Sequence, residues 1–453
     1  MNKENVFERK SIQQLIFIFS IPTICSLVLE SVSSMIDTVF AGHLGTMSSD
    51  ALAAMGILSP VLLLLIAAQL IFGVSTSIVI SKRLGENDQD GVNNTFKVGF
   101  YASCISSAVI SLLIFIFQDS LLNILGAKGS VLILAKDYLN ISVIYNVFSS
   151  VGYMLLNNIR AFGYPKMEIV VSVLATIIHV VFSIIFTFVL NMGIKGIALS
   201  TLVSEVFYFG ISLLFLIRKD KWIKKSNLIL SDAKVILISL VKIGFVQFLM
   251  QSLNSISGLI INRTLIKYGN ISYVGAWSIC GNINMVILLP LIGLTQGVQS
   301  VIAYFHGSKN KDKENQVKAK ITKYSLVYSI TVTALVYIFA NILVRIFTND
   351  MMLVDLSEDI IKIVVIGFPF VGIVYTLITF MQVSGEEEKA SKLEIIRQII
   401  VLIPLVVVLP MIFSNYNIFN ISPQIALFFA IPISNLVLVL MYSKKLKDNL
   451  KIK

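Results

Sequence analysis

Residues 12–41, IQQLIFIFSIPTICSLVLESVSSMIDTVFA, are long and apolar enough to cross a bilayer as one helix, yet they contain two carboxylates. Glu30 and Asp37 are seven residues apart, so on an α-helix they lie almost on one face, two turns from each other. An acid near the bilayer centre costs about 2.5–3.5 kcal/mol on insertion scales, and such residues mark functional sites by default. This stretch therefore predicts a membrane helix whose polar face has a function.

The composition of the whole chain agrees with this prediction. Of 453 residues, 56% are hydrophobic and 13% are charged, whereas soluble domains contain roughly a quarter charged residues. We expect an all-α integral membrane protein with twelve transmembrane helices. Their approximate limits are 12–41, 51–81, 95–117, 131–157, 167–190, 194–217, 235–262, 271–305, 321–346, 360–383, 393–413 and 423–443.

Lysine and arginine gather at the N-terminus, in every second loop and in the tail after residue 443. Arg160 and Lys166, for example, lie between the fourth and fifth runs. By the positive-inside rule these loops face the cytoplasm, which predicts that both termini are cytoplasmic. Because topology accounts for the net charge of +11, we expect no nucleic-acid partner. The polar segment 218–234 is predicted to be a cytoplasmic linker between an N-terminal lobe, 1–217, and a C-terminal lobe, 235–453.

The two halves carry similar motifs at a nearly constant offset. Gly163 and Gly385 lie 222 residues apart, and Gly73 and Gly297 lie 224 apart. A constant offset over most of each half indicates an internal duplication. Six spans is an even number, so both copies have the same orientation. We therefore expect two pseudo-symmetric six-helix bundles with a central cleft.

Several motifs give the chain a resemblance to a known family: IDT at 36–38, AGHLG at 41–45, LAA at 52–54, RAFGYPK at 160–166 and MGIKGIALST at 192–201. In this order and spacing they resemble the multidrug and toxic compound extrusion (MATE) transporters, and the second half resembles the MepA-like branch. The resemblance implies a transporter, not an enzyme, in a bacterial cell membrane. It implies export of amphipathic, often cationic small molecules in exchange for protons or sodium, with no cofactor and no obligate protein partner.

The resemblance also implies an ion-coupling site in the N-terminal half. The family's first-helix aspartate falls on Asp37, a fourth-helix tyrosine on Tyr138 and a sixth-helix threonine on Thr201. We expect Asp37 to bind a cation or proton and release it as the lobes reorient, rather than to serve packing alone. The proline that bends the family's first helix falls on Pro22, where we favour a hinge over a static kink.

The fifth helix departs from the family's pattern. A motif that usually reads Asn-x-x-x-Asp-Pro has His179 and Ser183 in place of the asparagine and the aspartate. Hard cations prefer several oxygen ligands, whereas a histidine, with an unperturbed pKa near 6.5, can carry a proton itself. We therefore expect proton coupling, with sodium at Asp37 as the alternative and no firm metal site. The C-lobe acids that some branches use have no counterpart that we recognise.

Glu30 and Glu205 stand where the family would be expected to have glutamine. Glu30 either shares a proton with Asp37, because two close carboxylates rarely both ionise, or lines a cleft that receives cationic substrates. Glu205 either faces the same cavity or lies near the membrane edge. The sequence assigns no substrate-binding residue, and it leaves the natural substrate, the resting conformation and the oligomeric state open.

Other functions remain as alternatives. A flippase for lipid-linked or polysaccharide precursors, of the same superfamily, would be expected to place cationic side chains in its cleft to bind a pyrophosphate, whereas the candidates here are acidic. An integral-membrane enzyme is disfavoured because the sequence has no H-E-x-x-H motif and only three histidines, far apart. A channel is conceivable, but nothing in the acidic helices identifies one.

Overall fold

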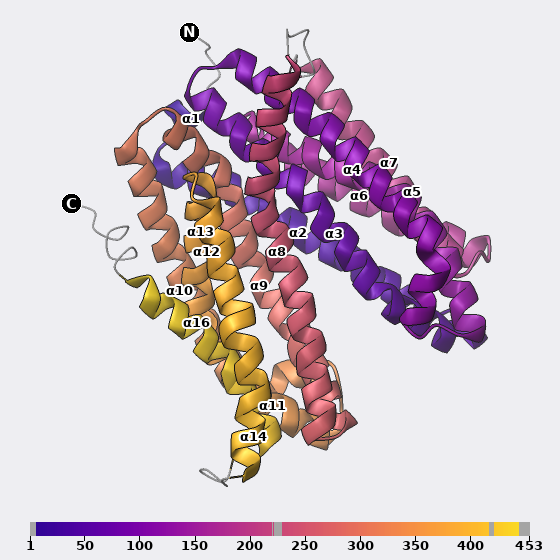
Figure 1. Ribbon diagram of the computed structural model, residues 1–453. Coiled ribbons are helices and arrows are strands. Elements are labelled where there is room, and N and C mark those ends of the chain that lie inside the picture. The colour runs from indigo at the N-terminus through magenta and orange to yellow at the C-terminus, as the bar shows by residue number, and fades with distance from the viewer. Residues whose placement is uncertain (1–5, 220, 222–228, 416–420, 444–453) are drawn as a thin grey trace. The chain divides into compact units, whose positions relative to one another are not determined.

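The computed structural model describes residues 6–219, 221, 229–415 and 421–443, which are helical apart from short turns and contain no β-strand. Residues 220 and 222–228 of the predicted linker 218–234, and the basic tail after residue 443, lie outside these residues. The first half contains α1 (Val6–Arg9), α2 (Ile12–Gly42), α3 (Ser48–Gly85), α4 (Gln89–Ile124), α5 (Gly129–Ala161), α6 (Pro165–Ile184) and α7 (Ile194–Arg218) (Figure 1). The second half contains α8 (Leu230–Tyr268), α9 (Ile271–Gly307), α10 (Lys311–Arg345), α11 (Met351–Ile366), α12 (Phe368–Val383), α13 (Glu387–Ile395), α14 (Ile403–Asn415), α15 (Pro423–Ala426) and α16 (Ala430–Met441).

The predicted all-α membrane fold with twelve spans is confirmed. In the described part of the chain, eleven continuous helical runs are long and apolar enough to cross a membrane, and α11 with α12 makes a twelfth. These two helices bend by 46° at a break around Gly367. Pro369 explains the break, because its ring removes a backbone donor and would clash with the carbonyl of Val365 in a continuing helix.

The chain forms two compact units, which we call unit 1 and unit 2. Unit 1 comprises Met1–Ser11, Phe17–Phe248 and Ala303–Lys309; unit 2 comprises Ile12–Ile16, Leu249–Ile302 and Asn310–Lys453. The division therefore falls inside α8, whose first half packs on unit 1 through Leu240, in one apolar cluster with Phe72 and Val98. The lobe limits drawn from the sequence stay a prediction.

Unit 1 has apolar clusters towards the two ends of its helices and polar side chains between them. In α5, one cluster includes Leu139 and the other includes Leu155, and the buried Ser142, Asn146 and Ser150 lie between these positions. The same order holds in α7, where buried Ser200 and Ser204 lie between Ile197 and Leu216. Lipid contact favours apolar side chains outside, so this polar middle is hidden inside the unit.

The turn geometry of the two halves repeats at the offset found in the sequence. Asn87 and Lys309, 222 residues apart, both have positive φ angles, 60° and 56°. The next residues, Asp88 and Asn310, both cap the following helix with a side-chain oxygen that accepts a backbone N–H. Such agreement in local conformation supports the internal duplication.

Candidate functional site

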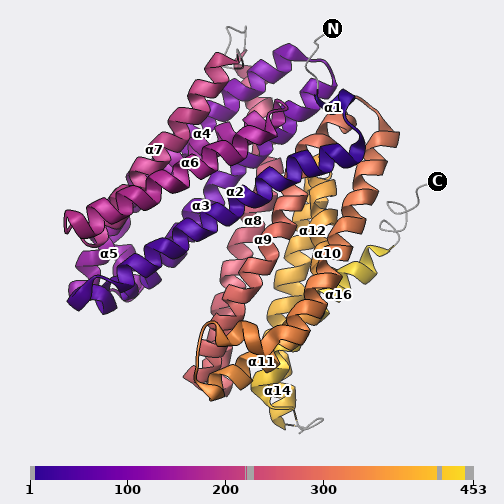
Figure 2. The same cartoon turned by 180° about the vertical axis from the view of Figure 1, so that it is seen from behind.

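A buried carboxylate–imidazole pair lies in the polar middle of unit 1. Asp37 belongs to the second half of α2, which Figure 2 shows along its length, and His179 to α6. The Nε2 atom of His179 is 3.0 Å from Oδ1 of Asp37, and the two side chains are 4% and 10% exposed. The fold therefore brings together two ionisable groups that are 142 residues apart in the sequence, and together they can hold and release a proton.

Three hydroxyl groups surround this pair. The oxygens of Ser183 and Thr201 are each 3.4 Å from Nε2 of His179. Ser183 in turn lies 2.5 Å, oxygen to oxygen, from Ser200 of α7. Which group donates depends on the histidine tautomer, so the same hydroxyls can adapt to either protonation state of the ring. The structure thus places three of the sequence-predicted residues around one imidazole nitrogen.

The pair has unused hydrogen-bonding capacity. Nδ1 of His179 is buried and has no hydrogen-bond partner among the described residues, whereas Oδ1 of Asp37 lies against Nε2 of the same ring. Buried polar atoms are nearly always bonded, and exceptions call for a functional explanation or an unseen proton, water or ion. The imidazole can therefore make one further hydrogen bond at Nδ1.

Two tyrosines of α5 complete the surroundings of Asp37. Tyr138, which the resemblance implied, is buried and lies within interaction range of Asp37 and Thr201. Tyr145, which we missed, interacts with Asp37 and also with Glu205. Its spacing of seven residues from Tyr138 puts both phenols on one helix face, and this spacing was a usable signal.

Glu30 and Glu205 form a second acidic position in unit 1. The carboxylate of Glu205 lies in electrostatic range of Glu30 and close to the hydroxyl of Ser149. Ser149 also donates to Oε1 of Gln69 over 3.3 Å. No contact joins Glu30 to Asp37 in the described part of the chain, so a proton shared between these two stays a prediction. Glu30 is exposed on the surface of α2.

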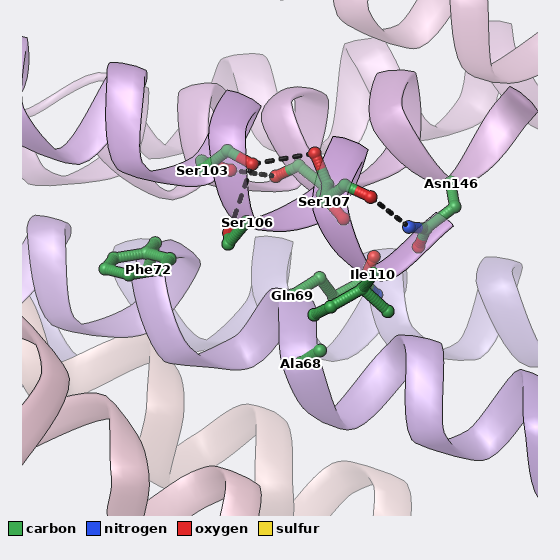
Figure 3. A pocket seen from close by; sticks show the side chains of 9 residues that line it. Ala68, Gln69, Phe72, Ser103, Ser106, Ser107, Ile110 and Asn146 are labelled. Carbon is green, nitrogen blue, oxygen red and sulfur yellow. Dashed lines mark hydrogen bonds between the residues drawn. The ribbon is translucent and has the colours of Figure 1, made fainter. Parts of the chain in front are cut away.

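A small polar pocket, lined in part by Gln69, lies between α3, α4 and α5. Its cavity volume is about 10 Å³, which is on the scale that holds one water molecule. Figure 3 shows Ser103, Ser107 and Asn146 facing Gln69 across this space. All four side chains are buried, so hydrogen-bonding groups extend from the Glu205 position into the interior of unit 1.

Pro22 lies inside α2, which runs as one helix through it. Next to it the structure shows a buried ion pair that sequence reasoning missed. Arg160, which we had counted among basic loop residues, is 1% exposed, and its NH1 atom lies 3.0 Å from Oε1 of Glu168. An acid directly after the Pro165 turn of a membrane run was the signal that could have found it.

Unit 2 also contains a buried carboxylate, at Glu394, that sequence reasoning missed. Its Oε1 is 2.5 Å from NH2 of Arg397, and both residues are buried. Gln398 connects this ion pair to α8, because its side chain bonds to Asn254 and accepts a bond of 2.8 Å from Ser257. Arg397 and Gln398 lie in the π-helical segment η3 (Ile396–Leu402), a backbone form often found at functional sites.

A helical membrane fold built from two repeated halves is an architecture of secondary transporters. The chain belongs to the MatE family, whose model matches residues 22–185 and 247–408, one segment in each half.

Relatives of known sequence agree along nearly the whole chain. It is 24% identical over 416 residues to the multidrug export protein MepA of Staphylococcus saprophyticus, covering 92% of this chain and 90% of the relative. It is 26% identical over 408 residues to MepA of Staphylococcus haemolyticus, covering 90% and 89%.

Solved structures agree in fold. The outward-facing conformation of a multidrug resistance MATE family transporter of the MOP superfamily matches with a TM-score of 0.89 and 22% identity, over 100% of this chain and 99% of that one. A MATE in the straight conformation matches with a TM-score of 0.86 and 22% identity, over 100% and 99%.

Proposed function

We propose that this transporter exports amphipathic, cationic small molecules from a bacterial cell in exchange for protons, across a plasma membrane in which both its termini are cytoplasmic. The observation that carries the proposal is the buried contact of 3.0 Å between Asp37 and His179. The relatives named as multidrug export proteins support export of several drugs.

The coupling follows from the cost of burying charge. An unprotonated pair carries a net negative charge inside the membrane, whereas uptake of one proton makes it neutral. Conformations that shield the pair therefore favour the protonated form, and conformations that hydrate it favour release. If drug and proton favour opposite conformations, linkage converts proton entry into drug export.

Protons suit this site better than sodium. Sodium requires several oxygen ligands, and here the hydroxyls of Ser183 and Thr201 each lie 3.4 Å from an imidazole nitrogen instead. Asp37 is the carboxylate in contact with this imidazole, over 3.0 Å. Sodium at Asp37 is therefore the alternative and not the leading proposal.

The acidic position at Glu30 and Glu205 supports cationic substrates. Two phenol rings, Tyr153 and Tyr208, lie in electrostatic range of Glu30. Carboxylates with aromatic rings attract lipophilic cations through charge and cation–π contact. The buried arginines Arg160 and Arg397 are each paired with a glutamate, so they offer little to the pyrophosphate that a flippase would bind.

Drug susceptibility of a host that overproduces the protein tests the role of Asp37. We expect the wild type to protect and Asp37→Asn to lose nearly all protection at equal membrane abundance, because the amide cannot take up the proton. The control is Asp119→Asn, because Asp119 lies in an exposed pair with Lys136, and such pairs contribute little. Equal protection by wild type and Asp37→Asn would remove Asp37 from the mechanism.

A further inference from the structure

The ion pair of Arg160 and Glu168 is also hydrogen-bonded to α2, through Thr23. Thr23 of α2 accepts a hydrogen bond from NH1 of Arg160 over 2.8 Å. Its hydroxyl also lies 3.0 Å from Oε2 of Glu168, to which it donates. Asn157 holds the other arm of the guanidinium, through a bond of 2.5 Å to NH2. Three helices, α2, α5 and α6, therefore meet at one buried hydroxyl.

The hydroxyl proton of Thr23 has two possible acceptors. One is Oε2 of Glu168, and the other is the backbone carbonyl of Phe19, also 3.0 Å away, in its own helix. A single proton serves one of them at a time. Hydrogen bonds to ionised groups are roughly twice as strong as neutral ones, so the bond to Glu168 dominates while the ion pair is intact.

The contact at Thr23 lies next to the proline that interrupts the backbone hydrogen bonding of α2. Thr23 directly follows Pro22, which lacks an N–H and leaves the carbonyl of Ile18 without its helical donor. One turn further on, Ser172 of α6 donates to Ser26 of α2 over 2.9 Å. The helix is therefore fixed to α6 immediately after the point at which it bends most easily.

We propose that Arg160 and Glu168 form a clamp that, through Thr23, positions α2 against α6 and so keeps Asp37 within reach of His179. Asp37 lies about 21 Å further along α2 than Thr23. A helix held at Thr23 carries its far half at a defined height and rotation, so the clamp sets the register of the ionisable pair without touching it. Arg160, Glu168 and Thr23 are positioning residues, and their effect on transport rests on the proposed proton coupling.

Substitutions of Thr23 separate this role from general stability. Thr23→Val keeps the shape of the side chain and removes the hydroxyl, whereas Thr23→Ser keeps the hydroxyl. The ion pair itself stays intact in both variants, so both should fold. The matched control is Thr264→Val, because Thr264 is a buried threonine of α8 whose hydroxyl donates to the carbonyl of Ile260 in its own helix.

The first readout is hydrogen–deuterium exchange of residues 17–30 in the purified full-length protein. We expect exchange about tenfold faster in Thr23→Val than in wild type, as for loss of hydrogen bonds to charged groups, and wild-type rates in Thr23→Ser and Thr264→Val. The second readout is the pH profile of drug export in vesicles, which should flatten in Thr23→Val and recover in Thr23→Ser.

Three results would overturn the clamp. The first is unchanged exchange in Thr23→Val. The second is faster exchange in Thr23→Val with an unchanged pH profile, which would mean that the contact is structural only. The third is a flattened pH profile in both Thr23→Val and Thr264→Val. If wild-type export itself shows no dependence on pH, the proposed proton coupling is wrong. In that case the exchange rates of residues 17–30 alone test the clamp, because they do not depend on the coupling ion.

Discussion

Asp37 and His179 place two ionisable groups of opposite kind in one buried space, where a proton can pass between them without crossing lipid. Sequence reasoning reached these residues because the positions match a family motif and because an acid in a membrane run is conspicuous. It did not reach Tyr145 or Glu168, whose partners become visible only when separate helices are placed side by side. Contacts of this kind have no local pattern in the chain.

Replacement of His179 by glutamine tests the imidazole as a proton carrier. Glutamine keeps hydrogen-bonding groups at the site but does not titrate. We expect export by His179→Gln, measured in vesicles, to vary less with pH than export by the wild type.

His43→Gln is the control for this substitution. His43 is exposed, and its ring bonds to the carbonyl of Val39 in its own helix over 2.8 Å. It should retain the wild-type profile. A wild-type profile in His179→Gln as well would show that Asp37 titrates without help from the imidazole.

Among the helices, the sequence predicted the spans well because hydropathy is a property of a whole segment. It predicted the interior poorly. Arg160 looked like a basic loop residue, and only the structure shows its position beside Glu168. Likewise the break at Gly367 depends on how Pro369 meets the preceding turn, so one run over 360–383 was expected where α11 and α12 form a bent pair.

A glycine of α3 makes a testable packing contact within unit 1. A Cβ atom added to Gly85 would lie 2.1 Å from the backbone oxygen of Tyr304, at the end of α9. We expect Gly85→Ala to destabilise the protein by about 1–3 kcal/mol, because backbone atoms cannot move aside cheaply.

Gly56→Ala is the control in the same helix, since nothing lies within 4 Å of its added Cβ. It should be neutral or slightly stabilising. Thermal unfolding of both purified variants gives the comparison, and equal midpoints would mean that α3 and α9 are not in close contact at Gly85.

The buried ion pair of unit 2 gives a second test of packing. Arg397→Met leaves Glu394 buried without its partner, which should cost about 3–5 kcal/mol of stability. The double variant Arg397→Met with Glu394→Leu removes both charges and should recover most of that loss. Thermal unfolding distinguishes the two, and a double variant as unstable as the single one would mean that the pair is needed for more than charge balance.

For the molecule as a whole, the constant offset between the halves predicted the duplication. The structure reproduces it in the matching φ angles of Asn87 and Lys309. The sequence did not show that α8 and α9 each contribute residues to both units, because that division depends on packing and not on composition. The family membership makes the chain a transporter, while its coupling ion rests on the chemistry of one site.

Drug export from vesicles with one ion gradient imposed at a time tests the central claim most directly. The purified protein is reconstituted, a fluorescent lipophilic cation is loaded, and either a proton or a sodium gradient is applied at fixed membrane potential. We predict that the proton gradient alone drives export and that Asp37→Asn abolishes it. Export driven by sodium at constant pH, with none driven by protons, would contradict the account.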